Sequence, residues 1–235
     1  ANPGAGRFAT HFVESVLLTW TGNVARIVIG IVALRLVTGA IAEDALGAYW
    51  ILTSLAGLLA NFADLGLGLG VVRFLPLTAD RGARRTLMQS VLLLRTLSLA
   101  GLCLLIFLGK PLVLRLFDAG AIDATYPYLY AFVVLTSLGE LYNNFLQGQN
   151  RFRMLAALAL VTSVGRLLLI VILVRTWHLG VPGLFVAESA ALLVTMAISA
   201  AFSGHGWRLR LDRSLGARQV RFGFPLYLNT LLAYT

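Results

Sequence analysis

Six charged side chains lie deep inside long apolar runs of this sequence, and their types could bind an anion. Three are arginines and three are carboxylic acids: Arg26, Arg95, Arg166, Asp64, Glu140 and Glu188. A charge at the centre of a bilayer costs about 2.5–3.5 kcal/mol even on permissive insertion scales, so each group needs a partner or a hydrated cavity. Because a guanidinium donates parallel hydrogen bonds to phosphate oxygens, the arginines favour a phosphate or diphosphate ligand.

Polar or small residues recur with these charges at steps of three and four, which is the spacing of one helix face. The longest stripes are Thr19-Asn23-Arg26-Gly30, Thr53-Gly57-Asn61-Asp64-Gly68 and Thr136-Glu140-Asn143-Gln147. Shorter stripes accompany Arg95 and Arg166. The pattern predicts helices that each turn one polar face toward a common interior.

The composition places those helices in a membrane. Of 235 residues, 59% are apolar and 12% are charged, against roughly 45–50% and 25% in an ordinary soluble domain. This excludes a soluble enzyme, a disordered tail, a collagen-like fibre and a disulfide-stapled secreted domain. Cys103 is the only cysteine, and no His or Cys cluster has metal-ligand spacing, so no metal or other cofactor is expected.

Six apolar runs are long enough to cross a bilayer as helices, which takes about 20 residues each. Their approximate limits are Phe12–Val37, Leu46–Leu75, Leu87–Leu108, Tyr126–Gln147, Met154–Val174 and Val181–Phe202. A seventh run starts near Phe222, and the chain ends within it. The sequence therefore predicts an all-α, multi-pass membrane protein. Since the first residue is not methionine and the chain stops inside this apolar run, an amino-terminal fragment of a longer protein is expected.

The basic residues of the joints predict the orientation of the spans. With a cytoplasmic amino terminus, eleven arginines lie in cytoplasmic segments and three basic residues lie on the opposite side. Such a bias is typical of membrane helices, and it explains the net charge of +9 without a nucleic-acid partner. Residues 204–221 alternate arginines with apolar residues, which predicts an amphipathic connector at the cytoplasmic interface.

Counting along the spans predicts how deep each charge lies. Asp64, Arg95 and Glu140 come out at similar depth and could form a buried ion network. Arg26 and Arg166 lie nearer the middle of the membrane, whereas Glu188 falls toward the outer side, too far to neutralise them. A cavity with unpaired positive charge at its centre is therefore expected. The alternative is that buried Arg–carboxylate pairs only fix helix register and bind no ligand.

A glycine repeat, Gly66, Gly68 and Gly70, lies near the inner end of the second run. No strand precedes it and no lysine follows it, so it does not fit a nucleotide-binding loop. It predicts either close helix packing or a bend.

Several motifs resemble those of a known family. They are Leu46-Gly47-Ala48-Tyr49-Trp50, Asn61-Phe62-Ala63-Asp64-Leu65-Gly66-Leu67-Gly68, Val71-Val72-Arg73-Phe74, Leu146-Gln147-Gly148-Gln149-Asn150-Arg151-Phe152 and Phe222-Gly223-Phe224-Pro225-Leu226. Together they resemble polysaccharide flippases of the Wzx type. These flippases form the polysaccharide transporter branch of the MOP superfamily, and they are related to MATE exporters and to the lipid II flippase MurJ. The resemblance covers most of the chain, from about Phe8 to Tyr234.

The resemblance implies a protein with two pseudo-symmetric six-helix lobes. This chain would then be the six-span amino-terminal lobe (1–203), the connector (204–221) and the start of the second lobe (222–235). The implied activity is movement of an undecaprenyl-diphosphate-linked oligosaccharide across the bacterial inner membrane by alternating access, without covalent catalysis.

In this hypothesis the candidate site residues divide into three groups. The arginines that attract the diphosphate are Arg26, Arg95 and Arg166. The amides that contact sugar hydroxyls are Asn23, Asn61, Asn143 and Gln147. The acids that hold the arginines or exchange a proton are Asp64, Glu140 and Glu188.

The expected partners are the lipid-linked oligosaccharide diphosphate, membrane lipid, a coupling proton or sodium ion, and glycosyltransferases and a polymerase of the same pathway. Two alternatives stay open, and a third, a membrane glycosyltransferase, would need a large aqueous loop with paired carboxylates elsewhere in the protein. A MATE-like multidrug exporter should have an acidic or aromatic cavity. A non-transporting membrane subunit of a polysaccharide synthesis complex should have all six charges paired in a filled interior.

Overall fold

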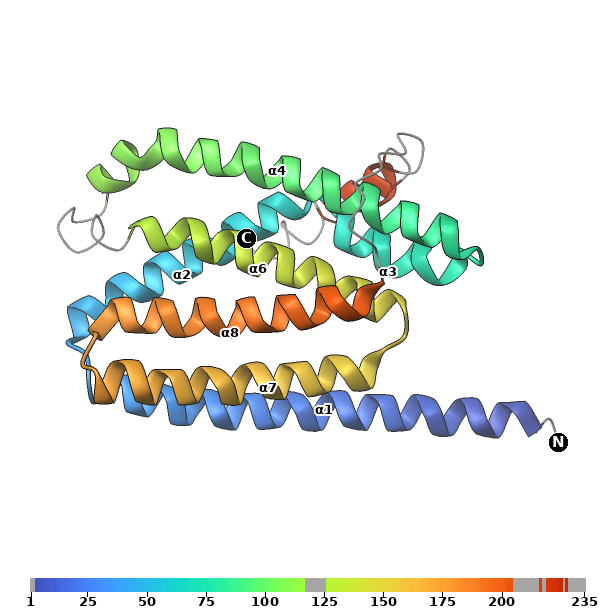
Figure 1. Cartoon of the computed structure of the whole chain (residues 1–235), viewed down its shortest axis with the longest axis horizontal. Helices are drawn as coiled ribbons and strands as arrows, with labels where there is room; N and C mark the ends of the chain where they lie inside the picture. The colour runs from blue at the N-terminus through green and yellow to red at the C-terminus, as the bar shows by residue number, and fades with distance from the viewer. Residues whose placement is uncertain (1–2, 117–125, 205–215, 217–218, 226, 228–235) are drawn as a thin grey trace.

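The chain folds into a bundle of long helices that lie roughly side by side (Figure 1). The computed structural model describes residues 3–116, 126–204, 216, 219–225 and 227, with side chains from Trp20 onward except at 113, 114 and 116. The elements are α1 (Pro3–Thr38), α2 (Glu43–Asp64), α3 (Leu67–Leu77), α4 (Arg81–Leu116), α6 (Tyr126–Gly148), α7 (Phe152–Ile170), the π-helical turn η1 (Val171–Thr176) and α8 (Gly180–Ser203). The all-α prediction is confirmed for these residues.

Within the described residues, five helices are long and apolar enough to cross a membrane. They are Trp20–Thr38, Glu43–Asp64, Arg81–Leu112, Phe152–Thr176 and Gly180–Ser203. Helix α6 matches the predicted fourth span in position but is not one of these five, and its sequence includes Glu140, two asparagines and a glutamine. It packs against α2, α3, α4, α7 and α8. The six predicted spans therefore correspond to five apolar helices and one more polar helix that contacts most of the others.

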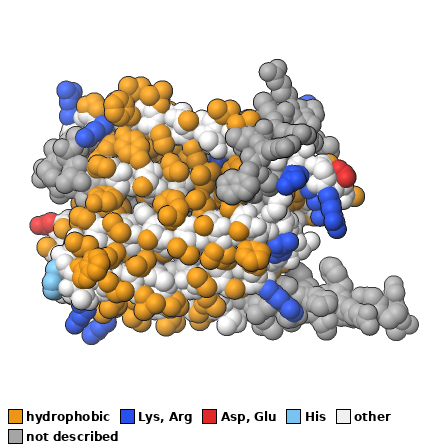
Figure 2. Space-filling view, viewed as in Figure 1, with side chains coloured by type: hydrophobic (Ala, Val, Ile, Leu, Met, Phe, Trp, Pro, Cys, Tyr) orange, Lys and Arg blue, Asp and Glu red, His pale blue; other side chains and the backbone are white. Residues whose placement is uncertain are grey.

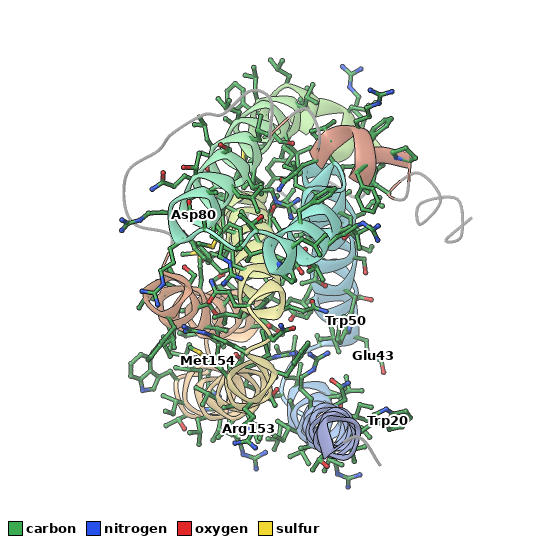
Figure 3. The ribbon with its side chains drawn as sticks, turned by 90° about the vertical axis from the view of Figure 1, so that its right-hand side faces the viewer. Trp20, Glu43, Trp50, Asp80, Arg153 and Met154 are labelled. Atoms are coloured by element: carbon green, nitrogen blue, oxygen red, sulfur yellow. The ribbon has the colours of Figure 1, made fainter. Side chains whose placement is uncertain are left out.

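Apolar side chains cover the outside of the bundle. On α1, Trp20, Ile27 and Ile31 are 62–69% exposed, and Trp20 points away from the other helices (Figure 3). Figure 2 shows apolar side chains across the middle of the visible face, with charged side chains mainly toward its ends. A contiguous apolar surface of this extent suits lipid tails rather than water.

The alternation of helix directions sorts the joints between the two ends of the bundle. The joint that precedes α4 and the joint between α6 and α7 lie at the same end as the amino terminus (Figure 1). These two joints carry Arg81, Arg84 and Arg85 and then Arg151 and Arg153. The predicted cytoplasmic arginines of these two joints thus share one end.

The predicted second span is divided into two helices, α2 and α3. The chain breaks at Leu65 and Gly66, which have positive φ angles of 49° and 75°. Oδ1 of Asp64 accepts a hydrogen bond from the backbone N–H of Gly68 at 3.1 Å. The last residue of α2 therefore caps the first turn of α3, whose N–H groups have no helical partner. Both predictions for the glycine repeat are confirmed: the bend is a full break in the helix, and Gly66 packs closely against the backbone of Gly223.

The interior contains two apolar clusters. The larger one joins α1, α2, α6, α7, α8 and η1 with the later part of α4. The smaller one joins α3, the early part of α4 and the end of α6. Along α4, Val91 belongs to the smaller cluster and Leu99 to the larger one. Arg95 therefore lies on α4 between the two apolar clusters.

The predicted connector, 204–221, and the predicted start of the second lobe, 222–235, lie mostly outside the described residues. Residues 219–225 are helical and contact α3. The Phe222 ring lies edge-on to Phe74 at 5.3 Å, and the guanidinium of Arg73 lies 4.9 Å from the Phe222 ring centre. The seventh helix, residues 219–225, therefore contacts α3, the second half of the divided span.

Candidate functional site

Arg95 on α4 is the centre of a polar cluster that joins three helices. Its Nη1 lies 2.6 Å from Oδ1 of Asp64 on α2, and its Nη2 lies 3.8 Å from Oε2 of Glu140 on α6. Nη2 also donates a hydrogen bond to the carbonyl of Ser137 at 3.2 Å. The ion network predicted for these three charged residues is therefore confirmed.

The Arg95 side chain is fully buried, with 0% of its surface exposed. Its two carboxylate neighbours and the carbonyl occupy both terminal nitrogens. A ligand would find no exposed guanidinium surface there. The geometry thus supports Arg95 as a residue that holds α2, α4 and α6 together rather than as a contact for substrate.

A second polar cluster joins α7, α8 and α2. Nη2 of Arg166 lies 2.6 Å from Oε1 of Glu188, and the same oxygen accepts a hydrogen bond from the Tyr49 hydroxyl at 2.9 Å. The prediction that Glu188 lies too far away to neutralise Arg166 was wrong. Counted from the cytoplasmic ends of their spans, the two residues differ by only two positions, which is roughly 3 Å of helix rise. An arginine side chain spans that difference easily.

A cavity of about 350 Å³ lies beside this second cluster, between α1, α6, α7 and α8. Figure 3, which looks along the bundle, shows α1 beside α7 at one edge of the lobe. The polar side chains that line the cavity are Arg26, Asn143, Thr162, Ser163, Arg166, Glu188 and Thr195. The rest of the lining is apolar except for the backbone at Gly30. The cavity therefore combines a few charges with hydroxyl and amide groups.

Neighbouring hydrogen bonds hold several of these polar groups in place. The hydroxyls of Thr162 and Thr195 bond to each other across α7 and α8. Oδ1 of Asn143 accepts a hydrogen bond from the Ser199 hydroxyl at 3.4 Å. These contacts fix the rotamers of the cavity wall, so its hydroxyl and amide groups are positioned before any ligand arrives.

Arg26 is the deep charge that has no carboxylate partner among the described residues. It is exposed on α1 and lines the cavity. The prediction of unpaired positive charge thus holds for Arg26 within the described part of the chain, but it was wrong for Arg166. The cavity contains two arginines and one glutamate, which gives it a formal charge of +1.

The four predicted amide residues do not come together. Asn143 lines the cavity, whereas Asn23, Asn61 and Gln147 are exposed on their helices and are not part of its lining. A stripe on one helix fixes only which residues share a face. Which way that face turns depends on the neighbouring helices, and this was not predictable from the stripes.

Tyr49 and the hydroxyl residues of helix α8 were not predicted from the sequence, although Glu188 on the same helix was. Glu188, Thr195, Ser199 and Ser203 follow one another at helical spacing and are all buried, so a polar face of α8 was visible in the sequence. Tyr49 gave a weaker signal. A tyrosine buried among apolar residues needs an acceptor for its hydroxyl, but nothing in the sequence indicated Glu188 as that acceptor.

Comparison with known proteins now places the chain in a family. The family model described as "Polysaccharide biosynthesis protein" matches residues 12–235. The chain belongs to this family. No curated protein sequence matches it. The predicted relationship to polysaccharide transporters is confirmed at this level.

Solved structures give the fold of this polysaccharide biosynthesis family member. A mutant of the Vibrio cholerae MATE transporter VcmN matches with a TM-score of 0.79 at 18% identity, over 96% of this chain and 54% of that chain. An outward-facing multidrug resistance MATE family transporter of the MOP superfamily matches with a TM-score of 0.70 at 18% identity, over 93% and 52%. A MOP superfamily transporter from Pyrococcus furiosus, described as having a binding pocket of reverse polarity, matches with a TM-score of 0.71 at 17% identity, over 93% and 52%.

These likenesses show that the family member has the MOP transporter fold. The chain spans about half the length of the solved structures that it matches. The predicted fold class, an all-α membrane protein with the fold of a MOP-type transporter lobe, is therefore confirmed. Substrate and activity do not follow from the fold, because one fold carries sites of different polarity.

Proposed function

We propose that this member of the polysaccharide biosynthesis family is one lobe of a flippase for an undecaprenyl-diphosphate-linked oligosaccharide. The observation that carries the proposal is the cavity beside Arg26, whose guanidinium has no carboxylate partner among the described residues. A charge in a membrane span is costly unless water or a ligand contacts it. A diphosphate that enters from the exposed side of α1 would supply the missing counter-charge through two parallel hydrogen bonds.

The remaining cavity groups suit the sugars of such a lipid. Asn143, Thr162 and Thr195 offer amide and hydroxyl groups that can bond to sugar hydroxyls. Alternating access between this lobe and a second one would expose the site to either face of the bacterial inner membrane. In the proposed orientation the amino terminus is cytoplasmic, a proton or sodium ion drives the cycle, and glycosyltransferases and a polymerase act before and after the flippase.

A MATE-like multidrug exporter is the second candidate, because solved MATE transporters share the fold. An organic cation would need an accessible acid. The acid of this cavity, Glu188, is already contacted by Arg166 and Tyr49, and the cavity has a formal charge of +1. Drug-resistance measurements on cells that make the intact protein separate the two functions, since only an exporter protects against cationic drugs.

A non-transporting subunit of a polysaccharide synthesis complex explains the structure less well. That alternative predicts that every deep charge is paired inside a filled interior. Among the described residues, Arg26 has no carboxylate partner and it lines a cavity of about 350 Å³. A purely structural role gives no reason for either feature.

Replacement of Arg26 by glutamine in the full-length protein is expected to slow flipping about 10- to 100-fold, because a hydrogen bond to a charged group contributes about 1.5–3 kcal/mol. The measurement is the transfer of a lipid-linked oligosaccharide from one leaflet to the other in proteoliposomes that contain the purified protein. Arg35→Gln is the matched control, since Arg35 is exposed on the same helix and does not line the cavity. Undiminished flipping by Arg26→Gln at equal protein content would remove the cationic site from the mechanism.

A further inference from the structure

We propose that Glu188 is a built-in competitor for the anionic group of the substrate. It occupies Arg166 before the substrate binds and is displaced when a diphosphate takes its place. The inference rests on the proposed function, because it presupposes an anionic ligand in this cavity. It adds a role for an acid that would otherwise oppose the binding of an anion.

The Arg166–Glu188 contact uses only part of each group. Oε1 of Glu188 accepts both the arginine and the tyrosine hydroxyl, whereas Oε2 has no hydrogen-bond or ion-pair partner in the described part of the chain. On the other side, Nε of Arg166 is buried and has no hydrogen-bond partner. A full arginine fork forms two parallel bonds and is correspondingly stronger. The pair is thus a single contact, and the Arg166 side chain, which is 35% exposed, keeps accessible surface for another anion.

A diphosphate has an advantage over the Glu188 carboxylate in this cavity. The carboxylate lies within 4 Å of Arg166 but not of Arg26, although all three side chains line the same space. A ligand with two phosphate groups can contact both arginines at once. It would therefore gain one ion pair that the carboxylate does not make, which favours exchange.

The polar groups near Glu188 come from four helices, α2, α7, α1 and α6. Tyr49 contacts it from α2 and Arg166 from α7, while Arg26 faces the same cavity from α1. Helix α6 contributes the uncharged Asn143 to the cavity. Within the described residues, Arg166 is therefore the cation that Glu188 would give up, and Tyr49 is the donor that holds the same carboxylate oxygen against it.

Displacement of Glu188 would also change how the helices are connected. Oε1 links α2 to α7 and α8 through its two contacts. An anion that took Arg166 would remove the arginine from this link, so that α7 is no longer tied to α2 through the acid. Because a ligand shifts a conformational equilibrium only through differential contacts, this exchange gives substrate binding a means to loosen the lobe. An uncharged ligand offers Arg166 no replacement and would leave the link intact.

The test is the affinity of the full-length protein in detergent for farnesyl diphosphate, with farnesol as the uncharged control. Glu188→Gln should bind farnesyl diphosphate about tenfold more tightly than the wild type, as expected if the pair is closed in roughly nine molecules of ten. Its affinity for farnesol should not change. Glu43→Gln is the matched control: it removes the same charge from an exposed position that does not line the cavity, and it should bind as the wild type does.

Two further variants keep the test decisive. Tyr49→Phe removes the hydroxyl that holds the acid and should tighten binding in the same direction by a smaller factor, whereas Arg166→Gln should abolish the gain given by Glu188→Gln. Unchanged or weaker binding by Glu188→Gln, at wild-type thermal stability, would overturn the proposal. If that variant does not fold, unchanged or weaker binding by Tyr49→Phe would overturn it.

The same measurements separate this inference from the proposed function. Wild-type protein that prefers farnesyl diphosphate to farnesol, together with a Glu188→Gln variant of unaltered affinity, would leave the flippase proposal standing and remove the competitor. Wild-type protein with no preference for the diphosphate would contradict both proposals.

Discussion

Replacement of Arg95 by leucine is expected to destabilise the lobe by about 1–3 kcal/mol, because it leaves the partly exposed carboxylates of Asp64 and Glu140 without their counter-charge and the Ser137 carbonyl without its donor. Arg95 is completely buried and contacts Asp64 at 2.6 Å, Glu140 at 3.8 Å and the Ser137 carbonyl at 3.2 Å. Among the described residues it is the charged side chain that joins α2, α4 and α6. Denaturant unfolding of the purified protein in detergent measures the loss.

Two companion variants test whether the loss comes from the unpaired carboxylates. Arg35→Leu removes an exposed arginine from α1 and should change stability by no more than about 0.5 kcal/mol. Adding Asp64→Asn to Arg95→Leu should recover part of the loss, because one uncompensated carboxylate is removed. An Arg95→Leu protein that unfolds at the wild-type denaturant concentration would show that the network does not stabilise the fold.

Replacement of Gly66 by alanine should cost roughly 2–4 kcal/mol, since it strains a left-handed backbone and places a methyl group where another backbone lies. The φ angle of Gly66 is 75°. A Cβ atom there would overlap the backbone of Gly223 in the seventh helix. The expected result is a lower thermal midpoint in detergent, with a fold that loses the close contact between the break in the second span and the seventh helix.

Gly57→Ala provides the matched control for this substitution. Gly57 lies within α2, and a Cβ atom there would meet no other heavy atom within 4 Å. Alanine should therefore leave stability unchanged or raise it by up to about 1 kcal/mol through helix propensity. Gly223→Ala should resemble Gly66→Ala, because its Cβ atom would overlap the backbone of Gly66. Equal stability of the Gly66 and Gly57 variants would contradict the close packing of the two glycines.

The break at Gly66 links the two predictions physically. Asp64 ends α2, caps α3 through the Gly68 N–H at 3.1 Å and pairs with Arg95 at 2.6 Å. One carboxylate oxygen accepts both contacts, so the break in the backbone and the ion network are built on the same atom. Loss of Arg95 is therefore expected to disturb the divided span as well as the charge balance.

The sequence by itself determined the class of the protein and the positions of its deep charges. Hydropathy, helical spacing and the cost of charge in lipid act locally along one chain, so they predicted the helices, the polar stripes and the network of Asp64, Arg95 and Glu140. The motifs predicted the family, which the match over residues 12–235 confirmed.

Tertiary structure decided which helix faces meet. The pairing of Arg166 with Glu188, the contact of Tyr49 with the same acid and the approach of Gly66 to Gly223 depend on helix rotation, tilt and neighbour order. None of these is encoded in the spacing of residues along a single helix, and a two-residue difference in depth is smaller than the reach of an arginine. For that reason the sequence placed six charges in the membrane, whereas only the packed helices showed that Arg166 has a carboxylate partner and that Arg26 has none among the described residues.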